Sequence, residues 1–205
     1  MGKKREPFDG SKYSPWSVLD AANAYYELSA VFTSKMQRQG IQNPDMYESV
    51  ASATNRILAL ELYMKAFMVG ACMPVPMEHN LVTLFNALPE RLREHCIRLY
   101  DEGDRANPGQ MRIRIESAFQ LTEVHGELEP SHVRVEFDPE LDTLLERNKH
   151  GFVDSRYLFQ SARYDQVGLY DYEYPRLALI CSILCEVLER DLQNRPLTYK
   201  RSFTF

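Results

Sequence analysis

The sequence lacks the residue patterns that mark several common classes of protein. It contains no glycine-rich phosphate loop, no HExxH zinc motif, no GxSxG nucleophile motif and no paired-carboxylate motif. The usual support for a nucleotide hydrolase, a metalloprotease or a serine hydrolase is therefore missing. Apolar runs such as LALICSIL, over 177–184, fall far short of the roughly 20 residues that cross a bilayer. We expect no membrane span.

Cysteine is also scarce and dispersed. The four cysteines form no CxxC pair and have no histidine at ligand spacing, so neither a zinc site nor a disulfide framework is indicated, and no metal or cofactor is expected. The basic residues near the start are not followed by an apolar stretch, which does not fit a secretory signal, and a cytoplasmic location is the default expectation. The net charge of -5 argues against a broad basic face for nucleic acid.

Helical periodicity dominates what is present. Ser14-Pro15 is typical of an N-cap followed by proline at the first helical position, and the apolar spacing behind it predicts a helix over 15–39. Asn43-Pro44 repeats the pattern, and its apolar stripe predicts a second helix that ends at Gly70. Further helices are predicted over 80–89, 90–100, 110–124, 139–149 and 175–193.

Short extended stretches interrupt these helices. Tyr170, Tyr172 and Tyr174 alternate with acidic residues, which is the period-two pattern of a ribbon. Segment 110–124 also contains a brief alternation, although its apolar spacing favours a helix, and 125–139 is expected to be a loop or lid. With 205 residues, the chain is long enough for one domain with a substantial core. We predict an all-α, up-and-down helical bundle of about five main helices. Its expected organisation is a flexible N-terminal segment over 1–13, the bundle over 14–194 and a C-terminal tail over 195–205.

Two segments carry a family resemblance. The first, LELYMKAFMVGACMPVPMEHNLVTLFNALP over 60–89, combines an amphipathic helix bearing a lysine, a proline-containing loop and a His-Asn-Leu start to a short leucine-rich helix. The second is FVDSRYLFQ over 152–160. Together with the helix order, they resemble HEPN-domain proteins over 15–193. The resemblance implies a bundle of four or five helices, often a homodimer, whose catalytic members cut RNA without metal.

The resemblance also implies a place for catalysis. In catalytic HEPN members an arginine is followed after four to six residues by a histidine, and two copies meet across a dimer. Here Arg147 and His150 are separated by only two residues, with Asn148 in the polar position between them. A histidine can move a proton and a guanidinium can hold a phosphate, so these three residues are candidates for catalysis. Gly151 follows directly, and Arg147 and His150 could equally lie in the last turn of a helix.

A second polar cluster follows in the chain. Asp154, Arg156 and Tyr157 are candidate ligand-binding residues. Arg156 could hold a phosphate, or it could be a structural side chain stacked between aromatic rings and paired with Asp154 or Glu61. His79 is more readily explained by a hydrogen bond that fixes the proline loop than by acid-base chemistry.

Three functions remain open on the sequence. The first is a HEPN-like binding or assembly module, dimeric and associated with RNA or a nucleotide, with its ligand groove near His150 and Arg156. The second is a metal-independent endoribonuclease of the toxin or antiviral type, which uses Arg147 and His150 of two subunits. The third, which the resemblance alone implies, is a partner module for a nucleotidyltransferase.

Overall fold

The computed structural model describes residues 6–39, 46–106, 113–117, 140–151 and 168–194. Within these ranges the chain is an all-α helical bundle with two short ribbons, which confirms the predicted fold class. Its helices are α1 (Pro15–Gln39), α2 (Met46–Gly70), α3 (Leu81–Asn86), α4 (Glu90–Ala106), α5 (Leu141–Arg147) and α8 (Tyr174–Asn194). None of the helices in the described ranges has the length and hydropathy of a membrane span.

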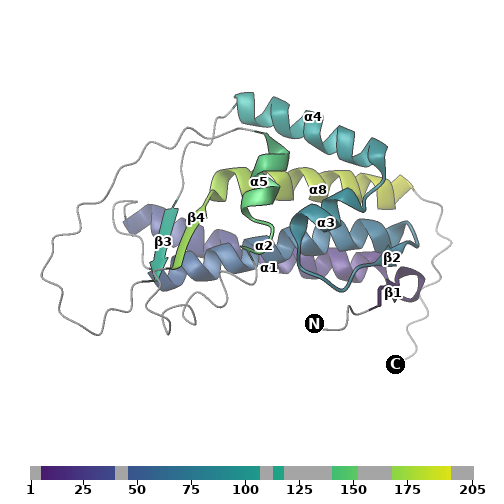
Figure 1. The fold of residues 1–205 in the computed structure, drawn as a ribbon, viewed down its shortest axis with the longest axis horizontal. Helices are drawn as coiled ribbons and strands as arrows, with labels where there is room; N and C mark the ends of the chain where they lie inside the picture. The colour runs from purple at the N-terminus through teal and green to yellow at the C-terminus, as the bar shows by residue number, and fades with distance from the viewer. Residues whose placement is uncertain (1–5, 40–45, 107–112, 118–139, 152–167, 195–205) are drawn as a thin grey trace, which may run out of the picture.

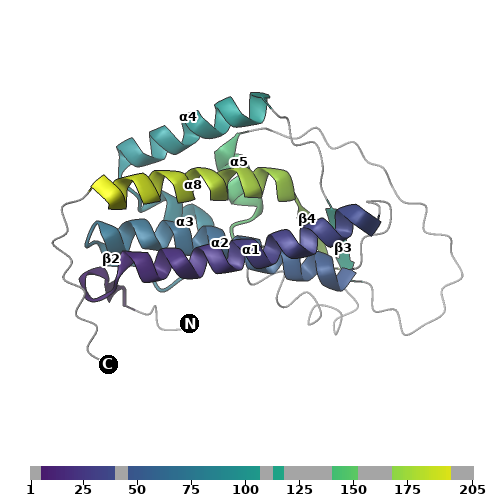
Figure 2. The same ribbon diagram turned by 180° about the vertical axis from the view of Figure 1, so that it is seen from behind.

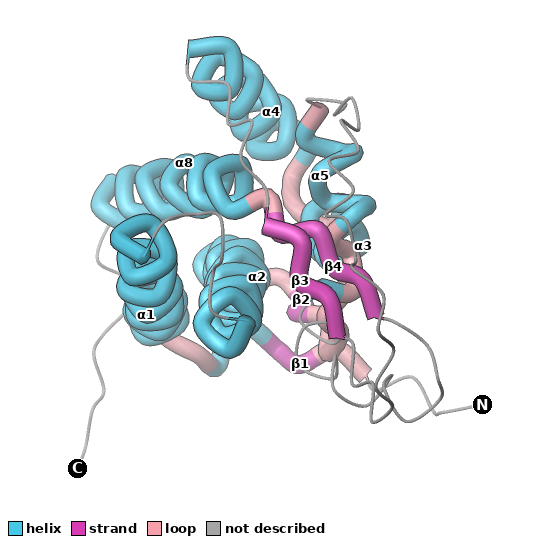
Figure 3. Tube along the Cα trace, turned by 90° about the vertical axis from the view of Figure 1, so that its left-hand side faces the viewer, coloured by secondary structure: helices cyan, strands magenta, loops and turns pink. Residues whose placement is uncertain are grey.

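The second helix, α2, is the centre of the bundle. Seen end-on in Figure 3, it lies between α1 and α8 on one side and α3 and α5 on the other, with α4 further out beyond α8. Figure 2 shows α1 and α2 running side by side along the molecule. In its second half, Leu60–Gly70, every residue is buried except the partly exposed Leu62 and Lys65. A helix that is apolar on nearly every face must be enclosed by its neighbours, and this explains its position.

The core draws one stripe from each surrounding helix. α4 shows the amphipathic pattern most clearly, because Cys96 and Tyr100, one turn apart, are fully buried while Glu94 and Arg98 are exposed. α4 passes close to α8 at Gly103, where a Cβ atom would lie 2.9 Å from Leu179 Cδ1. Other buried core residues include Leu19, Ile57, Tyr63, Met64, Leu81, Leu84, Leu141, Leu144, Leu177, Ile180 and Leu184.

Two antiparallel ribbons lie at opposite ends of the bundle (Figure 1). β1 (Phe8–Asp9) pairs with β2 (Pro74–Val75). Of the segment over 1–13 that was predicted to be flexible, the structure describes residues from Glu6 onward, and these form β1 and a 3-10 turn over Gly10–Lys12. Gly10 is buried against the end of α2, where a Cβ atom would lie 2.5 Å from Met73 O, so a larger residue does not fit.

The second ribbon corrects one helix prediction. β3 (Ile113–Ser117) lies inside the segment predicted as a helix over 110–124, and it pairs with β4 (Gly168–Tyr172) in the register Ile113↔Tyr172 to Ser117↔Gly168. The helix prediction was wrong for these residues, because the two β-branched isoleucines at alternate positions have a strand partner available far along the chain. The predicted tyrosine ribbon is confirmed over Tyr170 and Tyr172, whereas Tyr174 already belongs to α8.

The remaining helix predictions agree with the structure in place and type. α1 has the predicted bounds, and α2 ends at the predicted Gly70. Beyond α2 the chain reverses at Cys72, whose φ of 53° is left-handed, with Met73 N donating to Met68 O at 2.9 Å in a Schellman-type end. The predicted loop or lid over 125–139 and the tail over 195–205 lie outside the described residues.

Candidate functional site

A chain of ion pairs begins at the end of α5. Arg147, in the last turn of the helix as predicted, donates from Nε to Glu173 Oε1 at 2.7 Å and from Nη2 to Glu173 Oε2 at 3.1 Å. Both carboxylate oxygens therefore bind one planar guanidinium, the strongest geometry for such a pair. Glu173 lies between β4 and α8, and its side chain is only 3% exposed, while that of Arg147 is 32% exposed. The pair ties α5 to the start of α8.

The chain of ion pairs continues to α4. Arg176, near the start of α8, donates from Nη1 to Glu173 Oε2 at 3.3 Å and from Nε to Asp104 Oδ1 at 3.2 Å. Its side chain is 8% exposed and that of Asp104 is 10% exposed. Two arginines and two carboxylates thus alternate from α5 to α4, so each buried charge lies next to an opposite one. We refer to Arg147, Glu173, Arg176 and Asp104 as the ion-pair chain.

Tyr100 adds a neutral polar group beside the ion-pair chain. Its hydroxyl is buried and has no hydrogen-bond partner among the described residues. Burial raises the pKa of Tyr100, the charge of Arg176 acts in the opposite direction, and the carboxylates of Asp104 and Glu173 raise it further. The phenol therefore stays protonated and contributes no charge to the cluster.

The other two candidate catalytic residues differ sharply in their surroundings. Asn148 is 1% exposed and caps the C-terminal end of α5, with Nδ2 donating to Leu144 O at 2.8 Å. His150 is exposed and lies in the turn after the helix, beyond its last turn. The structure thus places Arg147 and Asn148 in contacts that hold α5, and it leaves His150 at the surface.

A second charged cluster lies on α2 under the proline loop. Glu61, with a side chain only 3% exposed, accepts from Lys65 Nζ at 2.7 Å through Oε1 and contacts His79 Nδ1 at 2.9 Å through Oε2. His79 is half-exposed and fixes the loop, as the sequence favoured. The neighbouring Asn80 caps α3, accepting from Thr83 N at 3.1 Å. We refer to Glu61, Lys65 and His79 as the loop cluster.

A backbone hydrogen bond connects the start of α3 with the turn after α5. Leu81 N, at the first residue of α3, donates to Lys149 O at 3.1 Å. The first of the two segments that carried the family resemblance, which contains the start of α3, therefore contacts the turn that bears His150. The bond also fixes α3 beside α5.

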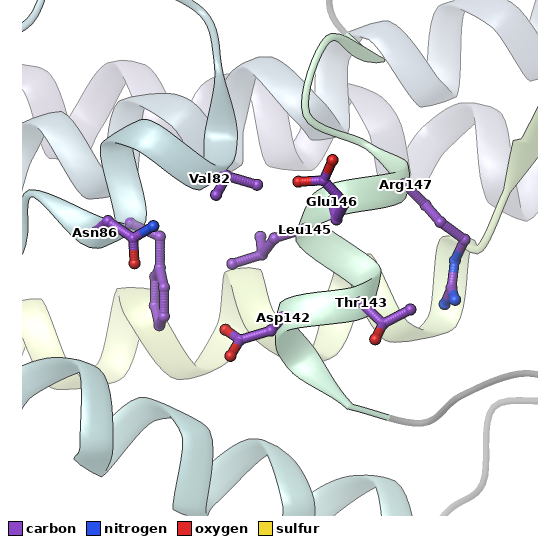
Figure 4. A pocket seen from close by; sticks show the side chains of 8 residues that line it. Val82, Asn86, Asp142, Thr143, Leu145, Glu146 and Arg147 are labelled. Carbon is purple, nitrogen blue, oxygen red and sulfur yellow. The ribbon is translucent and has the colours of Figure 1, made fainter.

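A groove of about 440 Å³ lies between α3 and α5. Its lining is apolar at Val82, Phe85 and Leu145 and polar at Asn86, Asp142, Thr143, Glu146 and Arg147. In Figure 4, Asp142 and Leu145 project from α5 toward Asn86, whereas the side chain of Arg147 points away to the other side of α5. The volume is at the lower end of the range for small-ligand and peptide pockets.

Three predicted binding residues, Asp154, Arg156 and Tyr157, lie outside the described residues. Arg156 had Glu61 as one of its two suggested partners, and in the structure the carboxylate oxygens of Glu61 bind Lys65 and His79. Within the described part of the chain, no group of three or more His, Cys, Asp or Glu side chains is placed to hold a metal ion.

Sequence reasoning missed Glu173, Arg176 and Asp104. A local signal existed for the first two, because a glutamate and an arginine three residues apart open an otherwise apolar helix. Asp104 gave no such signal, since it belongs to the polar stretch DEGDRANPG, which was interpreted as a break and whose first part instead extends α4 to Ala106. Lys65 was noted in the family motif, but its partner Glu61, one turn earlier, was not assigned to it.

Comparisons with protein-family models, with curated proteins and with solved structures all returned nothing. The function must therefore be argued from the geometry above.

Proposed function

We propose that this protein is a HEPN-like binding or assembly module that acts as a homodimer and does not cut RNA. The helical bundle agrees with the expected architecture. The proximity of the His-Asn-Leu segment and the turn bearing His150 is compatible with it as well. These features support the proposal of a HEPN-like fold. The proposal that the protein binds a partner and does not cleave RNA depends on the contacts of the candidate catalytic residues.

The observation that carries this proposal is the engagement of Arg147. A catalytic arginine must offer its guanidinium to the charge that develops on the phosphate. Here Nε and Nη2 of Arg147 already bind both oxygens of Glu173, a carboxylate that is almost entirely buried. To bind a phosphate through these groups, Arg147 would have to leave Glu173, which would keep only the partner Arg176. Asn148 is committed to Leu144 O in the same way.

The charge of the neighbouring groove gives further support. The exposed Asp142 disfavours an RNA backbone there, because phosphates are held by basic side chains and not by carboxylates, while Glu146 is paired with Lys149. The net charge of -5 acts in the same direction over longer distances. A partner that is not a polyanion fits this surface better.

The proposal is tested with labelled single-stranded RNA in the presence of a metal chelator. We expect no cleavage by the native protein and none by His150→Ala or Glu173→Gln, the second of which releases the guanidinium of Arg147 from a charged partner. Sedimentation analysis of the same samples is expected to show a dimer. Chelator-resistant cleavage that disappears in His150→Ala would overturn the assignment to binding. A protein that stays monomeric at all concentrations would overturn the proposed homodimer.

One observation favours the endoribonuclease as the second candidate. His150 is exposed and Arg147 is one-third exposed, so both side chains reach solvent at the end of α5. A partner subunit could bring a second copy of these residues to one phosphodiester. In that case the Glu173→Gln variant would cleave RNA faster than the native protein, and the His150→Ala variant would not cleave it.

A further inference from the structure

One side of α1 carries a stripe of uncharged residues that the bundle leaves exposed. The stripe advances by four, three, four and three residues, which is the spacing of helices that pair along a seam. Leu28 is 49% exposed and Val31 is 55% exposed, while the other members are small and exposed or partly exposed. We refer to the following five residues as the outer stripe: Ser17, Ala21, Ala24, Leu28 and Val31.

A second stripe of the same kind shows what this spacing does in the fold. On the opposite side of α1, Thr33 Oγ1 lies 2.9 Å from Ser52 Oγ on α2, and Tyr26 OH lies 3.3 Å from Ser182 Oγ on α8. This inner stripe consists of Leu19, Ala22, Tyr26, Ser29 and Thr33. It packs α1 onto two helices of its own chain, whereas no helix in the described part of the chain covers the outer stripe.

The sizes of its side chains make the outer stripe complementary to itself. Ala21 and Ala24 precede Leu28 and Val31, so one half of the stripe is small and the other half is large. In an antiparallel pair about a two-fold axis between Ala24 and Leu28, Leu28 lies opposite the partner's Ala24, and Val31 lies opposite the partner's Ala21. Each large side chain then enters the space above a small one, as in well-packed facing positions. A parallel pair would set large against large and small against small.

The charges of α1 favour the same occupant. Over residues 15–31 the only charged side chains are Asp20 and Glu27, and neither belongs to the outer stripe. In α4, by contrast, nine of the 17 residues are Asp, Glu or Arg. Two copies of a chain with a net charge of -5 repel each other, so contact between them requires a face without acids at its centre. An uncharged stripe also gives no means of selecting an oppositely charged protein.

We infer that the outer stripe of α1 is the homodimer interface, formed by two antiparallel copies of α1. The inference rests on the proposed function, because it names the surface through which the module assembles. From Ser17 to Val31 the stripe is about 21 Å long, which is short for an interface of about 800 Å² per partner, so the dimer dissociates on dilution in the micromolar range. Since α2 lies between α1 and α5 (Figure 3), this dimer keeps the two copies of His150 on its outer sides, where they do not share a phosphodiester.

Sedimentation velocity of the full chain between about 1 µM and about 500 µM tests the interface. Leu28→Glu and Val31→Glu are each expected to weaken dimerisation at least about tenfold, because each places a carboxylate against an apolar surface. Met77→Glu is the matched control, at a loop residue before α3 that is 46% exposed, and it is expected to leave dimerisation unchanged. Circular dichroism controls for folding. A dimer as tight as the native one in the two α1 variants, or equal weakening by Met77→Glu, overturns the inference.

A charge pair across the two-fold axis tests the orientation. In the double variant Ala21→Lys with Val31→Glu, the introduced lysine of each copy faces the introduced glutamate of the other if the helices are antiparallel. This variant is expected to dimerise at least about tenfold more tightly than Val31→Glu alone at low salt. In a parallel pair like charges would meet, so a double variant that dimerises no better than Val31→Glu overturns the antiparallel pairing.

Failure of the inference can be told apart from failure of the proposed function. If the native protein is a dimer and stays one in Leu28→Glu and Val31→Glu, the homodimer stands and only its interface is wrong. A native protein that is monomeric at every concentration overturns both the interface and the homodimer. Chelator-resistant RNA cleavage that depends on His150 overturns the assignment to binding, whatever the α1 variants do.

Discussion

Glu173 and Glu61 are both buried glutamates with two side-chain partners each, but they stabilise the fold over very different ranges. Glu173 binds Arg147, which is 26 residues away in the sequence, and it also binds Arg176. Arg176 in turn binds Asp104, which lies 72 residues before it in the sequence. Glu61 binds Lys65 on its own helix and His79 in the loop that follows the helix. The first carboxylate joins three helices into one unit, whereas the second fixes a loop locally.

The partners differ in chemistry as well as in distance. Arginine has a planar group that can bind a carboxylate through two parallel hydrogen bonds, so the ion-pair chain is held in a fixed geometry. Lys65 is largely buried, but His79 is about half exposed, so part of the loop cluster is screened by water. We therefore expect substitutions in the ion-pair chain to cost more than those in the loop cluster, and the following experiments test that order.

The largest effect is expected for Arg176→Ala. Removal of this side chain leaves Asp104 without its buried partner and takes one of two cations from Glu173. Loss of one partner from a buried ion pair typically lowers the free energy of unfolding by about 3–5 kcal/mol. Urea denaturation measures the difference. Arg190→Ala, which removes an exposed partner of Glu186, is the matched control and is expected to change stability by less than about 0.5 kcal/mol.

Arg147→Ala is expected to have an intermediate effect. Glu173 retains Arg176, and Arg147 is one-third exposed, so the loss is about 2 kcal/mol. The exposed Arg98, which pairs with Glu102 one turn away, supplies the control variant Arg98→Ala. If Arg147→Ala costs no more than Arg98→Ala, the guanidinium is not held by Glu173 in solution, and Arg147 returns to the candidate catalytic role.

The contacts of the two carboxylates also differ in whether they can be predicted from the sequence. The helices α1 and α2 followed from local signals, namely a proline after an N-cap residue and an unbroken apolar stripe. Lys65 and Glu61, one turn apart, could have been paired in the same way. Arg147 was correctly placed in the last turn of a helix, but its partner Glu173 was not predicted, because a contact across the fold leaves no periodicity in the sequence.

The same distinction explains the wrong helix over 110–124. Its apolar spacing is compatible with either a helix or a strand. Residues 113–117 form a strand because they pair with β4, which begins more than 50 residues after the start of β3. Local preference is a weak guide where a distant strand can complete the hydrogen bonds of the backbone. The candidate groove was likewise only partly predictable: His150 drew attention to the α5 end, while Asp142 and Asn86 become neighbours only through the packing of α3 on α5.

Two buried thiols of the core make the stability of the fold sensitive to alkaline pH. Burial raises the pKa of Cys96 and of Cys181 to about 12, from an ordinary value of 9.0. Above pH 9 the unfolded chain releases these protons while the folded chain does not, so the free energy of unfolding falls between about pH 9 and 12. Each thiol is expected to account for on the order of 1 kcal/mol by pH 10.

Stability curves of cysteine variants check this assignment. Cys181→Ala is expected to be less stable near neutral pH but to lose less stability between pH 9 and pH 11 than the native protein. Cys72→Ala, at an exposed position, is expected to keep the native slope. Burial also raises the pKa of Tyr63 and Tyr100, so a residual alkaline loss will remain in every variant. An unchanged slope in Cys181→Ala would show that its thiol ionises as readily in the folded chain as in the unfolded one.

The smallest effect is expected for His79→Ala, in the loop cluster. Glu61 keeps Lys65 Nζ at 2.7 Å, and the half-exposed imidazole is already partly solvated, so the free energy of unfolding is expected to fall by about 1 kcal/mol. The double variant with Lys65→Met is expected to lose more than the sum of the single losses, because only then has the buried carboxylate of Glu61 lost both partners. Urea denaturation of the four proteins in this cycle measures the coupling. If His79→Ala lowers the free energy of unfolding as much as Arg176→Ala does, the imidazole, and not the lysine, is the main partner of Glu61. The two buried glutamates would then differ in the sequence distance of their contacts but not in how much those contacts stabilise the fold.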